Sequence, residues 1–265
     1  MKPNNIGLSE ELAFAKGLVI NAAEFIQQPL EVETKEDGTP VTEIDKRISE
    51  YIFSQLKSVF PDYAILDEET EDDGSRFERE YCWVIDPLDD TRGFVQGGRD
   101  FGILIGLTRG FKPVLGVTYK PRKKELAYAV IGQGAYMEVN GAGERIAVEP
   151  SEKRSVFVSE SRSDNEELEE MLRRTDPDWV GYMGGALKAV EVARGRSTLY
   201  LCPTNFKIHL WDLCATQVIL EEAGGRITDI RGNPIDYSRK ETSHNLGVIA
   251  SNRIIHDDIV ERLNH

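Results

Sequence analysis

Cysteine and histidine are scarce in this chain of 265 residues, which has three cysteines and four histidines. The cysteines are Cys82, Cys202 and Cys214, an odd number with wide spacing and apolar surroundings. This pattern argues against a disulfide framework and predicts buried, reduced thiols. The histidines are scattered along the chain, which argues against a histidine-rich metal site.

Long apolar runs and an excess of basic residues are also lacking. No run approaches the ~18–20 residues of a membrane span, and the N-terminal MKPNNIGLSEELAF lacks the basic-then-apolar order of a signal peptide. We therefore expect a cytoplasmic protein with no membrane partner. The 32 Lys and Arg are outnumbered by 46 Asp and Glu, giving a formal net charge of −14. Such a surface repels nucleic acid polymers, and an anionic substrate would require bound cations.

The order of apolar patterns predicts a layered α/β fold. Helical spacing marks TEIDKRISEYIFSQL, NEELEEMLRR, residues 186–194, LWDLCATQVILEEAGG and residues 254–263. Short apolar or alternating runs predict strands at residues 64–66 and 81–85, a series of hairpins up to about residue 148, and two further strands in SVFVSES and LGVIASN. We expect two α/β subdomains, residues 1–150 and 151–265.

Acidic residues stand where predicted elements begin or end. In WVIDPLDDTRGF, residues 83–94, an apolar strand runs directly into Asp86 and Asp89. We expect the strand to end at Ile85 and Asp-Pro-x-Asp to form a tight turn, with Pro87 fixing φ. Glu68 and Glu69 follow the strand at 64–66, and Asp212 opens a helix. Oxygen ligands without His or Cys indicate Mg²⁺ or Mn²⁺. The neighbouring acids 71–73 are interpreted as a solvated loop.

Four stretches carry a family resemblance: GTPVTEID, ILDEE, IDPLDDT and, about 120 residues later, LWDLCATQVILEEAGGRITD. Over roughly residues 35–250 the chain resembles the inositol monophosphatase superfamily of metal-dependent, often lithium-sensitive phosphomonoesterases. The resemblance implies an αβαβα sandwich of two subdomains, two to three Mg²⁺ ions per active site with Mn²⁺ as an alternative, and a small phosphorylated metabolite as substrate. Many members of the family are dimers, so the helix EELAFAKGLVINAAEFI is either the contact face of a homodimer or part of the core.

The resemblance further assigns roles to single residues. Metal ligands would be Glu68, Asp86, the Leu88 carbonyl, Asp89 and Asp212. Thr91 and Asp45 would orient and deprotonate the attacking water, and Glu69 would assist. Substrate would be bound by Asp90, Thr91, Gly185, Lys188 and Asp212, with backbone N–H groups at 90–91 holding phosphate oxygens. From the sequence alone, Thr42-x-x-Asp45 is equally a helix capping box, and both readings are compatible.

Two departures from the family pattern bear on the substrate. Asp90 replaces the glycine of Asp-Gly-Thr, where its carboxylate would repel phosphate or bind another cation. Residues 201–210 contain no acid, whereas inositol phosphatases carry a glutamate there, and this segment has Lys207 and His209 instead. RGFVQGG, KPVLGVTYKP, GGALK, CPTN and IDYSRKETSHN are more similar to 3′(2′),5′-bisphosphate nucleotidases, in which the Lys188 position holds a phosphate.

Several alternatives stay open from the sequence. Lys188 is equally a solvent-facing helix residue, and a surface loop is favoured for Lys207 and His209. The substrate alternatives are inositol 1-phosphate, histidinol phosphate and fructose 1,6-bisphosphate. Asp90 also raises a hypothesis of another class, a non-catalytic regulatory member that binds metal or phosphate.

Overall fold

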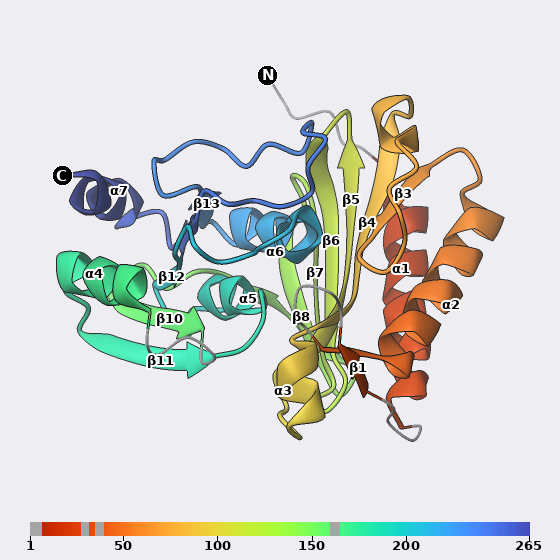
Figure 1. Ribbon diagram of the computed structural model, residues 1–265, viewed down its shortest axis with the longest axis horizontal. Helices are drawn as coiled ribbons and strands as arrows, with labels where there is room; N and C mark the ends of the chain where they lie inside the picture. Colours follow the sequence, from red (N-terminus) through yellow and green to blue (C-terminus); the bar gives the residue numbers. More distant parts are fainter. Residues whose placement is uncertain (1–6, 28–31, 35–39, 160–164) are drawn as a thin grey trace.

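The computed structural model describes residues 7–27, 32–34, 40–159 and 165–265. Figure 1 shows the described elements, which in chain order are α1 (Ser9–Ala22), the 3₁₀ helix η1 (Ala23–Gln27), β1 (Val32–Thr34), β2 (Pro40–Thr42), α2 (Glu43–Val59), β3 (Ala64–Asp67), the 3₁₀ helix η2 (Ser75–Phe77), β4 (Tyr81–Asp89), α3 (Thr91–Val95), β5 (Gly102–Arg109), β6 (Lys112–Lys120), β7 (Glu125–Val130), β8 (Gly134–Val139), β9 (Ala142–Ile146), β10 (Ser155–Ser159), α4 (Glu166–Thr175), β11 (Trp179–Met183), α5 (Lys188–Ala193), β12 (Leu199–Cys202), α6 (Leu210–Glu222), β13 (Arg226–Thr228), β14 (Val248–Ser251) and α7 (His256–Asn264).

Two large sheets organise the described chain. The first has seven strands in the order β3-β4-β5-β6-β7-β8-β9, antiparallel except for the parallel pair β3–β4. The second has five strands in the order β11-β10-β12-β14-β13. The sequence-order hairpins β5 to β9 confirm the series of strands predicted up to about residue 148.

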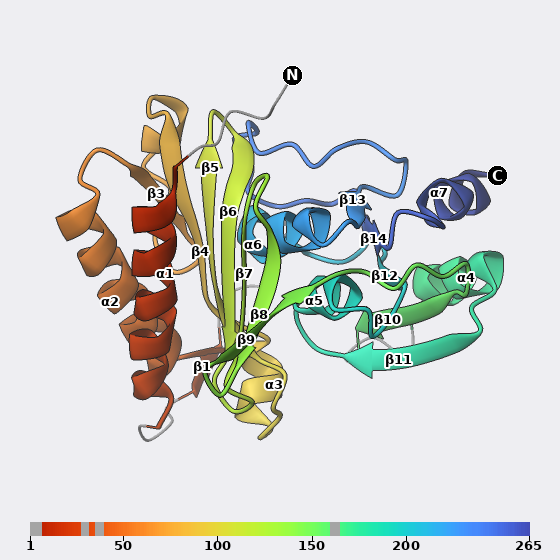
Figure 2. The ribbon, with the colours of Figure 1, turned by 180° about the vertical axis from the view of Figure 1, so that it is seen from behind.

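Helices and sheets alternate as five layers. Figures 1 and 2 show α1 and α2 on one face of the seven-stranded sheet, α5 and α6 between the two sheets, and α4 and α7 beyond the five-stranded sheet. The predicted αβαβα sandwich is therefore confirmed. The first sheet ends at Ile146 and the second begins at Ser155, but α6 packs on β5 and β6 of the first sheet. The division into subdomains 1–150 and 151–265 stays a prediction.

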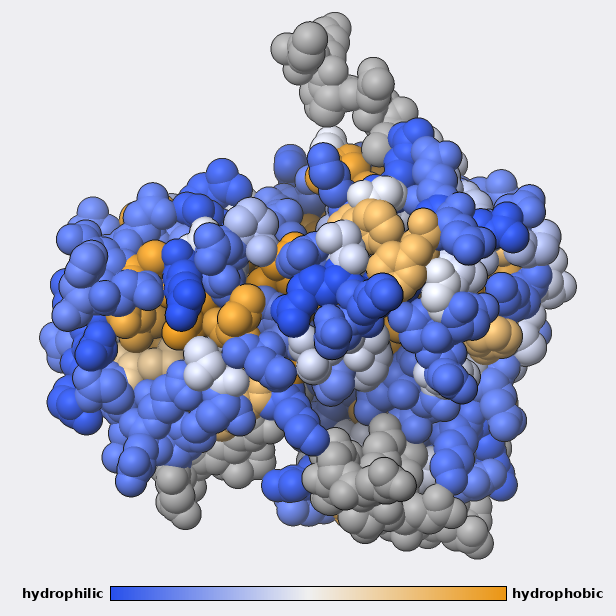
Figure 3. Space-filling model, turned by 45° about the horizontal axis from the view of Figure 1, so that its top comes forward, coloured by the Kyte–Doolittle hydropathy of each residue, from blue (hydrophilic) through white to orange (hydrophobic). Residues whose placement is uncertain are grey.

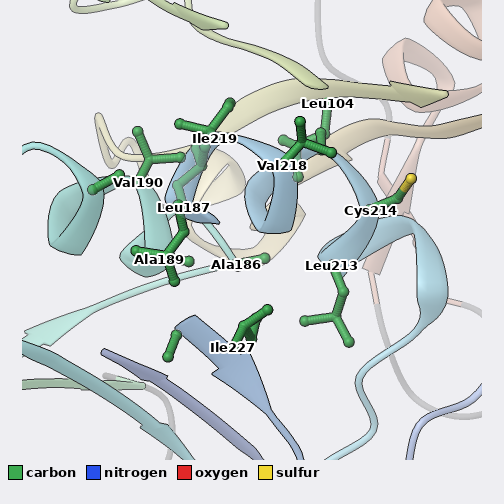
Figure 4. Close-up of a cluster of buried hydrophobic side chains, with 14 of the residues drawn as sticks. Leu104, Ala186, Leu187, Ala189, Val190, Leu213, Cys214, Val218, Ile219 and Ile227 are labelled. Carbon is green, nitrogen blue, oxygen red and sulfur yellow. The ribbon is translucent and has the colours of Figure 1, made fainter. Parts of the chain in front are cut away.

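Helix α6 is the central element of the interior. Its residues from Leu213 to Leu220 are all buried, as expected of a helix with a sheet on either side. Close approach to the seven-stranded sheet depends on two glycines, because a Cβ on Gly106 would lie 2.5 Å from Cys214 Sγ and one on Gly116 would overlap the Ala215 backbone. Figure 4 shows this core, with apolar side chains of α5, α6 and both sheets in contact.

The hydrophilic surface and the buried cysteines agree with what the composition predicts. Hydrophilic residues dominate the face shown in Figure 3, as the 29% of charged residues leads one to expect. All three cysteines are free and buried, which confirms their prediction. Among the described residues, no helix is at once long and apolar enough to cross a membrane.

Candidate active site

The end of strand β4 carries two of the predicted metal ligands. The strand does not stop at Ile85 but continues to Asp89, with a shift of register against β5 between Asp86 and Asp89. The predicted strand end and tight turn are therefore wrong. Pro87 has no N–H to donate to the ladder, so the strand accommodates it in an irregularity of the kind that re-aims side chains. Within it, the Leu88 N–H donates to Asp86 Oδ1 over 3.1 Å.

Three carboxylates that are distant in sequence meet at this point. One oxygen from each of Asp86, Asp89 and Asp212 lies within 4.8 Å of the others. Asp86 and Asp89 are buried, and Asp212 is half-buried. Asp212 occupies the first turn of α6, where its Oδ2 accepts the His209 N–H over 2.5 Å. The structure thus brings together three of the predicted ligands.

The electrostatics of the cluster favour a cation. Burial, and next the charge of Glu68, raise the pKa of Asp86 well above its usual range. Burial and the charge of Asp89 do the same to the pKa of Asp212. Burial raises the pKa of Asp89 to about 6, although it accepts hydrogen bonds from the Ala186 and Leu187 N–H groups. Buried acids that repel one another, with only oxygen donors, fit a hard divalent cation that would relieve the repulsion.

The loop after β3 brings further acids near the cluster. Glu68 and Glu69 are half-buried; the Glu68 N–H donates to the Ile85 carbonyl over 3.2 Å and the Glu69 N–H to Asp67 Oδ1 over 2.8 Å. Glu68 therefore lies beside β4, close enough to raise the pKa of Asp86. Its role as ligand and the assisting role of Glu69 stay predictions.

Beside the cluster is a hydroxyl–carboxylate pair. Thr91 Oγ1 lies 2.9 Å from Asp45 Oδ1 and 3.0 Å from the Leu88 carbonyl oxygen. The other Asp45 oxygen accepts the Thr42 N–H over 2.7 Å and also the Thr42 hydroxyl, and the Asp45 N–H returns a bond to Thr42 Oγ1. The predicted capping box is confirmed, and the same carboxylate faces Thr91. Burial, the largest influence, raises the pKa of Asp45 above its ordinary value.

The substituted residue Asp90 begins helix α3 in a left-handed conformation, with φ of 65° and ψ of 49°. A glycine adopts this conformation readily, whereas a residue with a side chain adopts it at a cost. The Asp90 carboxylate accepts the Gly93 N–H over 3.2 Å. It therefore caps α3, an interaction that the sequence analysis did not anticipate.

The segment between β11 and α5 lies against Asp89. Gly185 has a φ of 64°, and a Cβ there would overlap the Asp89 carboxylate. Lys188 is buried, so its interpretation as a solvent-facing residue is wrong. Its Nζ donates to the Met183 carbonyl over 3.1 Å and to the Gly185 carbonyl, and it lies 5.0 Å from the centre of the Tyr200 ring. Substrate binding by Gly185 and Lys188 stays a prediction.

The two other candidate side chains lie at the start of α6. Lys207 is exposed, while His209 is half-buried and stacks on Trp211, with ring centres 4.4 Å apart and an angle of 3° between planes. His209 Nδ1 also lies 3.3 Å from Thr242 Oγ1. The surface-loop interpretation suits Lys207 better than His209, which is held on two sides.

Sequence reasoning missed Arg76, a buried residue of the 3₁₀ helix η2, which follows the acidic loop after β3. Its Nε lies 2.7 Å from Asp72 Oδ2, so part of the acidic loop is paired and half-buried rather than freely solvated. The guanidinium also donates to backbone carbonyls far along the chain, those of Tyr237, Arg239 and Lys240. Backbone acceptors leave no trace in a sequence, so no signal was available for this contact.

A carboxylate cluster that suits a divalent cation, beside a hydroxyl–carboxylate pair, fits a metal-dependent hydrolase. The chain belongs to the inositol monophosphatase family, whose profile matches residues 6–265. It is 33% identical over 237 residues to the 3′(2′),5′-bisphosphate nucleotidase CysQ of Salmonella typhimurium, covering 87% of this chain and 95% of the relative. It is 30% identical over 245 residues to the inositol-1-monophosphatase of Bacillus subtilis, covering 91% and 89%.

A solved structure of similar fold is the IMPase of Thermotoga maritima, with a TM-score of 0.81 and 28% identity over 96% of this chain and 97% of that one. Family membership makes the protein a phosphoric monoester hydrolase, which confirms the predicted enzyme class. These similarities do not establish the particular substrate, the ion or the expected homodimer, which stay predictions.

Proposed function

We propose that the protein is a Mg²⁺-dependent 3′(2′),5′-bisphosphate nucleotidase that converts adenosine 3′,5′-bisphosphate to AMP. The observation that carries the phosphatase chemistry is the contact of Thr91 Oγ1 with Asp45 Oδ1, at 2.9 Å, beside the Asp86, Asp89 and Asp212 cluster. The similarity to CysQ over 87% of the chain supports the nucleotide as substrate.

The start of α6 supports the same choice. The segment 201–210 has no acid to hold inositol hydroxyls, and the stacked rings of His209 and Trp211 stand just before Asp212 in the sequence. Half-buried aromatic rings suit a flat purine base better than a polyhydroxylated ring. Inositol 1-phosphate is the second candidate, supported by the similarity to the Bacillus subtilis enzyme.

The proposed mechanism divides the work among the described residues. Glu68, Asp86, Asp89, Asp212 and the Leu88 carbonyl would hold two to three Mg²⁺ ions. Bound Mg²⁺ would lower the pKa of a coordinated water and offset charge on the leaving oxygen.

The chain's own groups orient the reaction. The Thr91 hydroxyl accepts a hydrogen bond from the attacking water and passes its own proton toward Asp45, whose raised pKa makes it a better base. Backbone N–H groups of residues 90–91 hold phosphate oxygens. Attack occurs in line with the leaving oxygen, with no covalent intermediate.

The test is phosphate release with Mg²⁺ from four substrates side by side: adenosine 3′,5′-bisphosphate, inositol 1-phosphate, histidinol phosphate and fructose 1,6-bisphosphate. Asp86→Asn is the inactive reference, and Glu71→Gln, an exposed acid on the neighbouring loop, is the matched control that keeps activity. Preference for the nucleotide supports the proposal, and preference for another substrate keeps the mechanism and overturns the specificity. No turnover of any, with metal bound, favours the non-catalytic regulatory alternative.

A further inference from the structure

The residue that departs from the family pattern, Asp90, fits its surroundings closely. Its carboxylate lies between two glycines, Gly93 of α3 and Gly184 of the segment before α5. A Cβ on Gly184 would lie 2.6 Å from Asp90 Oδ1 and closer still to Cγ and Oδ2. One on Gly93 would lie 2.7 Å from Asp90 Cγ. At both glycines, the three nearest atoms all belong to Asp90, so the space that each glycine leaves is filled by this one side chain.

Neither glycine is required by its own backbone. Gly93 and Gly184 are absent from the residues with positive φ, so an alanine would be unstrained at either position apart from the clash with Asp90. Gly185, in contrast, has a φ of 64° and would be strained with any side chain. A Cβ at Gly93 or Gly184 would thus meet the carboxylate of residue 90 before any other described group.

The contact continues into the predicted metal site. Asp89 and Asp90 are adjacent, and they lie against the adjacent residues Gly185 and Gly184. In the next two residues of that segment, the Ala186 N–H donates to Asp89 over 2.8 Å and the Leu187 N–H over 3.3 Å. A side chain that fixes Gly184 therefore also fixes the backbone donors that orient the Asp89 carboxylate.

We propose that Asp90 is a positioning residue: its carboxylate, held by the Gly93 N–H and enclosed by Gly184, locks residues 184–187 onto the end of β4 and so sets the orientation of Asp89. This inference rests on the site proposed above. It assigns to the Asp90 carboxylate a role that the family's glycine cannot have, and that role involves neither coordination of an ion nor contact of the carboxylate with the substrate.

The test is a double-mutant comparison read out by Mn²⁺ binding, followed by electron paramagnetic resonance, and by the thermal unfolding midpoint. Neither readout requires turnover, so the result is independent of the substrate proposal. Gly184→Ala is expected to weaken Mn²⁺ binding about tenfold, as loss of an outer-shell contact does, and to lower the midpoint. In the Asp90→Gly background the same Gly184→Ala change is expected to alter neither, because the clashing carboxylate is gone.

The conservative variant separates positioning from coordination. Asp90→Asn keeps the shape and an oxygen acceptor for the Gly93 N–H, and is expected to bind Mn²⁺ within about twofold of the native protein, far less than the 10–100-fold typical of a lost ligand partner. Gly17→Ala, where a Cβ meets nothing within 4 Å, is the control for adding a methyl group.

Two results would overturn the proposal. One is an equal effect of Gly184→Ala in both backgrounds, and the other is loss of a bound Mn²⁺ in Asp90→Asn, which would make the carboxylate a ligand. If Gly184→Ala yields no folded protein, recovery of folded protein in the double variant tests the same contact. Gly93→Ala with and without Asp90→Gly repeats the comparison on the opposite side of the carboxylate.

Discussion

Replacing Arg76 by methionine should destabilise the fold far more than its place next to an acidic surface loop would indicate. The side chain is only 3% exposed. Its Nε pairs with Asp72 at 2.7 Å, and its terminal nitrogens donate to the carbonyls of Tyr237, Arg239 and Lys240 at 3.2, 2.7 and 2.9 Å. Methionine matches the apolar stem but supplies no donor, so every one of these acceptors loses this partner.

The magnitude follows from these contacts. Hydrogen bonds to a charged group contribute about 1.5–3 kcal/mol each but are not additive within one network. Removing one partner of a buried ion pair costs about 3–5 kcal/mol. Because Asp72 is 21% exposed and recovers some hydration, we expect Arg76→Met to lower the free energy of unfolding by about 3 kcal/mol. Arg76→Lys keeps the charge without the planar fork, so about half of that loss is expected.

Urea denaturation followed by tryptophan fluorescence measures this change. Arg109→Met is the matched control, because Arg109 forms a comparable pair with Glu80 at 2.6 Å but is 44% exposed; its loss should cost under about 0.5 kcal/mol. Hydrogen exchange should also accelerate in residues 237–240, the segment whose carbonyls Arg76 contacts. A loss below about 1 kcal/mol for Arg76→Met, or one equal to that of the control, would refute the assignment of Arg76 as a buried clamp.

Three further predictions concern an ion pair, a histidine and the Thr91 hydroxyl. Lys120→Met should lower the free energy of unfolding by about 2–3 kcal/mol in urea, because Lys120 and Glu191 are 3% and 5% exposed and 2.8 Å apart; no measurable change would contradict a buried pair. Burial lowers the pKa of His256 to about 4, so the unfolded chain binds the extra proton first as pH falls below about 6.5. The free energy of unfolding should then drop by about 3 kcal/mol between pH 6.5 and pH 4, a slope that urea titrations should find reduced in His256→Asn. Thr91→Ala should reduce kcat about 100-fold at saturating Mg²⁺ while Thr91→Ser retains most of it; equal rates for both would exclude the hydroxyl.

The site was predictable to the extent that its residues carry local signals. Asp86 and Asp89 follow an apolar run, and Asp212 stands in the first turn of a strongly apolar helix, so a shared metal site could be inferred across about 120 residues. The capping box of Thr42 and Asp45 has a spacing that can be read directly. The capping box and the meeting of the three carboxylates are confirmed, because short-range patterns determine where each carboxylate stands on its own element, and metal binding stays a prediction.

Contacts between distant segments were not predictable. The continuation of β4 past Pro87 depends on pairing with β5, and the burial of Lys188 depends on carbonyls that only the folded chain places around it. The glycines around Asp90 are visible in the sequence, but one sequence does not reveal which side chain fills the space that they leave. In each case, contacts between distant parts of the chain determine a structure that the neighbouring sequence does not predict.

The position of helix α6, buried between the two sheets, links the candidate metal site to the folding of the chain. It carries Asp212, whereas Asp86 and Asp89 belong to the seven-stranded sheet on which it packs. In any state in which this helix has separated from that sheet, the three carboxylates are apart and cannot bind one ion together. A bound ion would therefore stabilise only the state in which α6 is packed on the sheet. The free energy of unfolding should then rise with the concentration of the ion.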